Sequence, residues 1–94
     1  MIKINIPQIT DIDTVISIYY RYPEISTKEI EKLFKRHSKS TIIRLKKLAQ
    51  QKMIEDNIYT HGIYKINTEC AYKAWGLNVE DLEKRRNKLQ RLGL

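Results

Sequence analysis

Residues 38–53 read SKSTIIRLKKLAQQKM, and the fold of the chain depends on how this stretch is arranged. At about 100° per residue, its pattern predicts one helix with two unlike faces. One face is an apolar stripe made of Ile42, Leu45, Ala49 and Met53, with Leu48 on its flank. The opposite face combines basic and polar side chains with one apolar residue: Ser40, Ile43, Arg44, Lys47 and Gln51. An ordinary solvated face remains the alternative, since Lys and Arg are good helix formers that favour surfaces.

The positive charge of the chain is concentrated around this stretch. The formal net charge is +7, and residues 31–54 alone carry eight basic side chains and one acidic side chain. The remaining basic and acidic side chains balance one another. A generic soluble surface interleaves the two signs, so this block favours an anionic polymer such as nucleic acid as its partner.

Two capped helices are expected before the basic stretch. The first runs over about residues 11–22, with Thr10 as its N-cap. The second runs over about residues 27–35, because Ser26 and Glu29 form a capping box at its start. Two short helices joined by a tight turn, the second one basic and amphipathic, are typical of a helix-turn-helix.

The period of the pattern changes after the basic helix. Two strands are predicted, one from Ile54, Ile58 and Tyr59 and the other from Ile63, Tyr64 and Ile66. The dipeptide His61-Gly62 lies between them and suits the tight turn of a β-hairpin. At the other end of the sequence, residues 1–7 alternate isoleucine with polar residues, which predicts a short N-terminal strand.

Two further stretches carry a resemblance to a known family. Residues 48–55, LAQQKMIE, are similar to the end of a recognition helix followed by Gly-Leu-Ile and a charged residue, with Lys52 where glycine is usual. Residues 64–67, YKIN, are similar to the Tyr-x-Leu-Thr that closes a second wing strand, and Cys70 stands where glycine is common. From residue 11 to residue 67 the chain therefore resembles the winged helix-turn-helix DNA-binding family, in the form of its small bacterial and phage regulators. The resemblance implies a left-handed backbone at Lys52.

The expected fold class is α+β, mostly α, in a single domain over residues 1–94. Its winged helix-turn-helix core spans residues 10–67 and consists of three helices and a β-hairpin wing. The N-terminal strand precedes this core, and additional C-terminal helices follow it over residues 68–94.

The C-terminal helices leave two interpretations open. The first begins at Asn67 or Thr68 and ends at Gly76, and the last runs from about Asn78 to residue 92. One side of the last helix carries three leucines, Leu82, Leu89 and Leu92. This row either packs on its own domain or pairs with a second copy, and the narrow row favours a homodimer.

Candidate DNA contacts come from three parts of the predicted fold. In a major groove, the base-facing set of the basic helix is Ser40, Ile43, Arg44 and Lys47, in which arginine suits guanine and isoleucine suits a thymine methyl group. The residues nearer the groove rims, which suit phosphates, are Lys35, Arg36, Lys39 and Lys46. The start of the second helix adds Thr27 and Lys28, and the wing adds His61 and Lys65.

Catalytic and metal chemistry have no candidate arrangement. His37 and His61 have no metal-ligand spacing to Cys70 or to a carboxylate pair, and no glycine-rich phosphate loop is present. We therefore expect no catalytic residue, no metal and no cofactor, with Cys70 as a small buried hydrophobe. One cysteine forms no internal disulfide, and neither a membrane-spanning run nor a signal peptide is visible, so a cytoplasmic location is expected.

The expected function is sequence-specific binding of double-stranded DNA by a dimeric transcriptional regulator. One alternative is a winged-helix protein–protein interaction module whose basic helix docks an acidic partner. Another is a phage or plasmid replication factor, which also binds DNA. The salt dependence of binding separates the first two, because phosphate contacts release counterions and apolar contacts do not.

Overall fold

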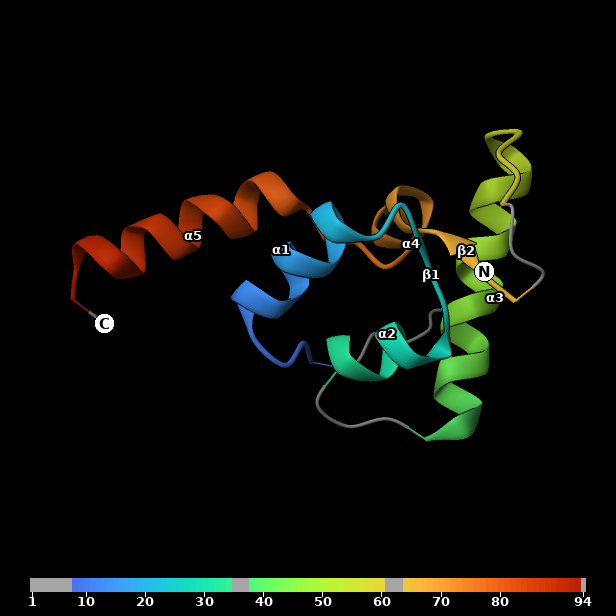
Figure 1. Cartoon of the computed structure of the whole chain (residues 1–94), viewed down its shortest axis with the longest axis horizontal. Coiled ribbons are helices and arrows are strands. Elements are labelled where there is room, and N and C mark those ends of the chain that lie inside the picture. Colours follow the sequence, from blue (N-terminus) through green and yellow to red (C-terminus); the bar gives the residue numbers. More distant parts are fainter. Residues whose placement is uncertain (1–7, 35–37, 61–63, 94) are drawn as a thin grey trace.

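Five α-helices and one small antiparallel sheet make up the described part of the chain (Figure 1). The structure is a computed structural model that describes residues 8–34, 38–60 and 64–93. In chain order the elements are α1 Ile12–Arg21, β1 Glu24–Ile25, α2 Thr27–Leu33, α3 Lys39–Glu55, β2 Ile66–Asn67, α4 Thr68–Ala74 and α5 Val79–Arg91. The fold class is thus α+β and mostly α, as predicted. The expected strand over residues 1–7 lies outside the described residues.

The sheet joins two segments that are far apart in the sequence. β1 pairs antiparallel with β2, with Glu24 opposite Asn67 and Ile25 opposite Ile66. The predicted hairpin differs from this arrangement, because Ile54 belongs to α3 and residues 56–60 contain no strand. Its predicted turn at residues 61–62 lies outside the described residues. β2 therefore pairs with a strand that precedes α2 and not with residues 56–60 after α3.

The C-terminus of α3 corrects the expectation of a left-handed residue at Lys52. The helix continues past Lys52 and ends in a Schellman motif, in which the Ile58 N–H donates to the Met53 carbonyl (2.9 Å). The Asn57 N–H donates to the Ile54 carbonyl (3.2 Å), and Asn57 is the residue with positive φ, at 55°. Asparagine enters this region more readily than lysine because its short polar side chain bonds locally.

The N-terminus of α1 is capped one residue later than predicted. The Asp11 carboxylate accepts hydrogen bonds from the Thr14 N–H (2.7 Å) and the Thr14 hydroxyl (2.8 Å), and these bonds lower the pKa of Asp11. Thr10 instead donates its hydroxyl hydrogen to the Lys32 carbonyl (2.8 Å), which ties the start of α1 to the end of α2. Thr10 is thus a link between helices and not a cap.

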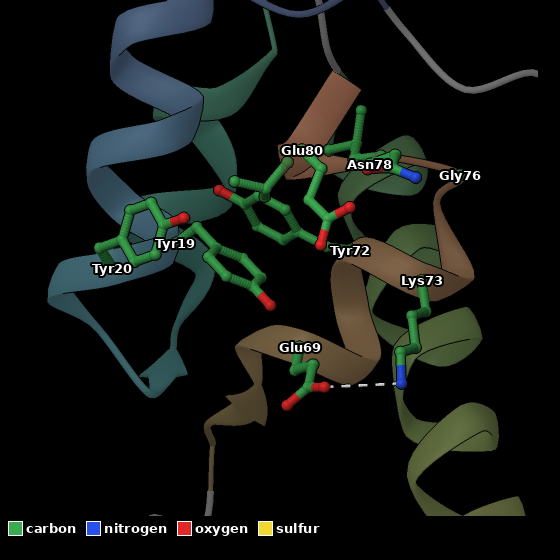
Figure 2. A pocket seen from close by; sticks show the side chains of 10 residues that line it. Tyr19, Tyr20, Glu69, Tyr72, Lys73, Gly76, Asn78 and Glu80 are labelled. Carbon is green, nitrogen blue, oxygen red and sulfur yellow. Dashed lines mark ion pairs between the residues drawn. The ribbon is translucent and has the colours of Figure 1, made fainter. Parts of the chain in front are cut away.

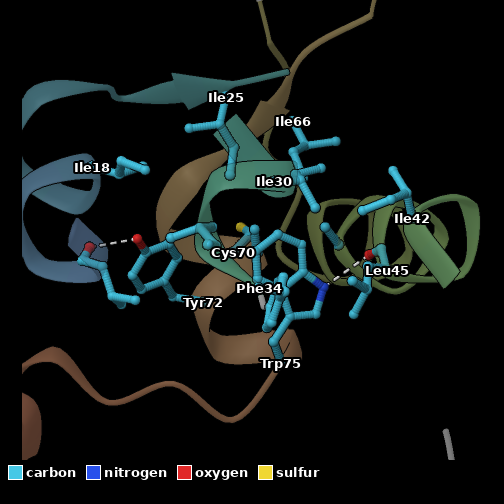
Figure 3. Packing of buried hydrophobic residues seen from close by; sticks show 14 of the residues in the cluster. Ile18, Ile25, Ile30, Phe34, Ile42, Leu45, Ile66, Cys70, Tyr72 and Trp75 are labelled. Atoms are coloured by element: carbon cyan, nitrogen blue, oxygen red, sulfur yellow. Dashed lines mark hydrogen bonds between the residues drawn. The ribbon is translucent and has the colours of Figure 1, made fainter. Parts of the chain in front are cut away.

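α4 is the helix on which the core is assembled (Figure 3). The indole Nε1 of Trp75 donates to the Leu45 carbonyl at 2.9 Å and joins α4 to α3. The Tyr72 hydroxyl donates to the Val15 carbonyl at 2.6 Å and joins α4 to α1. Both rings are almost completely buried. The first contact fixes α3 against α4 and the second fixes α1 against α4, and the buried apolar stripe of α3 faces this core.

Candidate nucleic-acid interface

The outward face of α3 consists of the residues that the sequence predicted. These five residues are all exposed: Ser40, Ile43, Arg44, Lys47 and Gln51. The apolar Ile43 is exposed over 54% of its surface. The apolar stripe of Ile42, Leu45, Ala49 and Met53 is buried against the core, with Leu48 partly buried beside it. The two-faced helix is therefore confirmed. What the outward face binds is a separate question, which depends on its electrostatics.

The first turn of α3 favours anions. Ser38 is its N-cap, and the Ser38 hydroxyl oxygen accepts from the Thr41 N–H (3.2 Å). The turn has no acidic residue, and the exposed Lys39 is its first residue. The positive end of the helix dipole therefore adds to the charge of Lys39 at this point.

A hydrogen bond brings the start of α2 to the middle of α3. The Lys46 ammonium donates to the Thr27 hydroxyl oxygen (3.2 Å), and Lys46 is partly buried. Lys28, the next residue of α2, is exposed. Three predicted phosphate contacts, Thr27, Lys28 and Lys46, therefore lie together. Because an ammonium has three donors, Lys46 can bond to Thr27 and still reach an anion.

Most basic side chains of α3 form no ion pair with another described residue. Within the described ranges, Lys39, Arg44 and Lys47 form no ion pair, whereas Lys52 pairs with Asp56 at 3.5 Å. Among the described residues, the ion pair of α3 thus lies at its C-terminal end. The positive charge of α3 is strongest over its first three turns.

The remaining predicted contacts are not gathered by the described structure. Lys35, Arg36 and His61 lie outside the described residues. Lys65 is exposed, and its carbonyl accepts from the Thr60 hydroxyl (3.1 Å). Two further aromatic side chains near this segment, Tyr59 and Tyr64, are 85% and 80% exposed, and the sequence pattern did not mark them as candidate contacts. Both were expected in strands, whereas the structure places neither of them in a strand.

The leucine row of α5 is divided by the structure. Leu82 is partly buried and packs against the domain's own core. Leu89 and Leu92 are 41% and 62% exposed. In Figure 1, α5 lies along α1 at its start and its C-terminal part extends beyond α1. Leu82 thus packs on its own domain, as the first interpretation expects, and the pairing of Leu89 and Leu92 with a second copy stays a prediction.

No arrangement for metal chemistry is seen in the described residues, which contain no group of three or more His, Cys, Asp or Glu side chains placed around a common point. Cys70 is 1% exposed, as predicted for a small buried hydrophobe, and burial raises the pKa of its thiol. A buried thiol with a raised pKa is a poor nucleophile.

Comparison of the chain with protein families, curated proteins and solved structures gives no match. Among the helices of the described ranges, none is long and apolar enough to cross a membrane.

Proposed function

We propose that this protein binds double-stranded DNA as a winged-helix transcriptional regulator and reads the major groove with α3. The observation that carries the proposal is the outward face of α3, where exposed basic residues lie on a helix held rigidly by its opposite face. The order of helix, helix and basic helix supports the helix-turn-helix part of this fold, whereas residues 56–60 contain no strand and do not support the hairpin wing. An α-helix fits the width of the major groove.

The central residues of α3 supply the reading chemistry. Arg44 can bond both acceptors of a guanine edge, and Ile43 supplies an apolar surface for a thymine methyl group. Lys47 lies one turn after Arg44 on the same exposed face. Ser40 lies one turn before Arg44 and presents a hydroxyl that can donate or accept. The four residues form one line along the helix.

The flanking residues supply phosphate contacts. Lys39 and the first turn of α3 attract one phosphate, and the cluster of Thr27, Lys28 and Lys46 attracts another. Lys35, Arg36, His61 and Lys65 remain predicted contributors. Contacts of this kind hold the protein on the duplex without reading its sequence.

Salt dependence tests the proposal directly. If about six of the basic residues in the charged segment meet phosphates, log K falls against log salt with a slope near −5 per subunit. The measurement is fluorescence anisotropy of a labelled duplex at several salt concentrations. A flat response, or no binding to a mixed-sequence duplex, contradicts the proposal.

Two variants then separate base reading from phosphate binding. Arg44→Ala should weaken binding to a selected site by about 1–3 kcal/mol and weaken binding to random duplex much less. Lys39→Ala should weaken both to a similar extent and reduce the salt slope by about one. Equal losses on both duplexes for Arg44→Ala would show that α3 does not read bases.

The homodimer belongs to the same proposal, with an interface of two leucines in place of the three that the sequence predicts. Leu89 of α5 and Leu92, the C-cap of α5, are exposed, and burial against a second copy would remove them from water. Replacing both with Asp should give monomers, because charges in an apolar seam are costly. Sedimentation of the wild-type protein at micromolar concentration is the measurement. A monomeric wild-type protein contradicts this part of the proposal.

A protein-interaction module is the second candidate function. The observation in its favour is the apolar exposure on α3, where Ile43 is joined by Ile54, which is 77% exposed. The acidic Glu55 and Asp56 follow Ile54 and disfavour phosphate at that end. A shallow salt slope with an acidic protein partner would support this function. A phage or plasmid replication factor would show the same DNA binding as a regulator.

A further inference from the structure

A groove of about 690 Å³ lies between α1, α4 and the start of α5 (Figure 2). No residue of α3 lines it. Its walls come from Tyr19 and Tyr20 of α1, from Glu69, Tyr72 and Lys73 of α4, and from residues 76–80. Ligand sites in proteins usually measure about 300–1,000 Å³, so the groove has room for a small organic molecule.

Three tyrosines form its aromatic wall. The rings of Tyr19 and Tyr20 are perpendicular with centroids 5.3 Å apart, and the ring of Tyr72 lies 5.0 Å from that of Tyr19. Two of the rings are fixed by hydrogen bonds, because Tyr72 donates to the Val15 carbonyl and Tyr20 donates to the Glu83 carboxylate. The wall is therefore preorganised. Tyr72 is 1% exposed and supports the wall from behind, so the exposed ring of Tyr20 and the partly exposed ring of Tyr19 offer the electron-rich faces that attract cations.

The charge of the groove is opposite to that of the protein. Its charged lining residues are Glu69, Glu80 and Lys73, and Lys73 pairs with Glu69 at 3.5 Å. This pair leaves Glu80 as a carboxylate without an ion pair among the described residues. Figure 2 shows the Glu69 carboxylate joined to the Lys73 ammonium, apart from Glu80, which lies nearer the tyrosines in this view. A phosphate or other anion would be repelled here, although the chain as a whole carries +7.

We propose that this groove binds a small organic cation, an ammonium whose nitrogen carries alkyl groups. The tyrosine faces attract its charge through their quadrupoles and contact its alkyl groups at the same time. Glu80 supplies the opposite charge at the edge of the wall. A bare divalent metal does not fit, because the described residues include no group of three metal-ligating side chains. This site is independent of the DNA-binding face and adds a small-molecule ligand to the protein.

Choline and its uncharged carbon isostere, 3,3-dimethylbutan-1-ol, form the matched pair of probes. They differ mainly in the charge of the quaternary centre, so their comparison isolates the cationic contribution. Trp75 is the single tryptophan of the chain, and its ring lies 6.2 Å from that of Tyr72, which makes its fluorescence a reporter of the groove. The backbone amide signals of Gly76 and Leu77 give a second readout by NMR.

We expect saturable changes with choline, at an affinity about tenfold higher than that for the uncharged isostere. Sodium chloride at equal ionic strength should give no such change. Tyr20→Ala and Glu80→Gln should each weaken choline binding by about threefold or more. Both positions are exposed, Tyr20 over 65% of its surface, so both variants should keep the wild-type circular dichroism spectrum.

Tyr64→Ala and Glu55→Gln are the matched controls, since each makes the same substitution at an exposed residue outside the groove. They should bind choline as the wild type does. Equal affinity for the two probes would overturn the proposal, as would the absence of saturation by choline up to about 100 mM. Unchanged affinity in Tyr20→Ala and Glu80→Gln would overturn it as well. The titration uses free protein, so its result does not depend on whether the protein binds DNA.

Discussion

Gly76 lies in the turn between α4 and α5, and its substitution tests how much the backbone of this turn contributes to the free energy of unfolding. It follows α4 with φ +72°, and its N–H donates to the Lys73 carbonyl (3.2 Å) in the turn that leads to α5. A Cβ added at this glycine would meet no atom within 4 Å, so Gly76→Ala changes the backbone energy without a clash. A non-glycine residue in the left-handed region costs about 1–2 kcal/mol, and alanine recovers part of that by restricting the unfolded chain.

The expected result for Gly76→Ala is a loss of about 1 kcal/mol in the free energy of unfolding. In a domain of this size that loss lowers the melting temperature by about 4–8 °C. Urea unfolding followed by tryptophan fluorescence and by circular dichroism measures it. The denaturant slope should not change, because no additional surface is exposed.

Gly93 is the matched control for Gly76. It also has φ +72° and no atom within 4 Å of an added Cβ, but it follows the exposed end of α5. Strain there can be relieved by fraying of the last turn, so Gly93→Ala should leave global stability almost unchanged. Equal losses in the two variants would refute the reasoning, because they would show that packing around the turn does not matter. An unchanged Gly76→Ala variant would refute it also.

Three further predictions follow from single contacts. Lys52→Gly should destabilise the fold by about 1 kcal/mol because Lys52 lies inside a helix, while Asn57→Gly should be neutral or stabilising. Urea unfolding measures both variants. The reverse order of stabilities would show that Lys52 is the left-handed residue. Trp75→Phe should lower the free energy of unfolding by about 2–3 kcal/mol, since it removes the hydrogen bond to the Leu45 carbonyl and leaves unfilled volume. Circular dichroism during urea unfolding measures this loss. A loss below about 0.5 kcal/mol contradicts the prediction. Hydrogen bonds from Thr14 lower the pKa of Asp11 in the folded protein, so its stabilising effect is present above about pH 4 and is lost as the pH falls through the folded pKa. The stability difference between wild type and Asp11→Ala should therefore shrink from pH 7 to pH 3, and a constant difference contradicts the cap.

Local signals in the sequence were sufficient for most helix ends. The capping box of Ser26 and Glu29 is present, and Asn67 and Asn78 cap α4 and α5 as predicted. Gly76 has the positive φ that a glycine after a helix indicates. These features depend on residues within one turn of each other, so their geometry is largely determined by local sequence.

Pairing between distant segments could not be predicted in the same way. The sheet joins Ile25 to Ile66, and no short-range pattern specifies that partner because both residues are simply apolar and β-branched. The predicted hairpin followed from the apolar spacing after Met53, yet Ile54 continues the helix and Tyr59 is exposed. In the candidate site, helical periodicity was enough to identify the outward face of α3. The contact between Lys46 and Thr27 depends on how two helices pack, which periodicity does not encode.

The central claim is that the outward face of α3 binds DNA, and charge reversal at matched positions tests it most directly. Arg44→Glu/Lys47→Glu reverses an exposed Arg and Lys three residues apart on α3, and Arg85→Glu/Lys88→Glu reverses the same pair at the same spacing on α5. Both variants have the same net charge, so general attraction to DNA falls equally. We expect the α3 variant to lose duplex binding by about 100-fold or more and the α5 variant to stay within about fivefold of wild type, as measured by anisotropy at fixed salt. Equal losses in the two variants would show that net charge, and not the face of α3, accounts for binding.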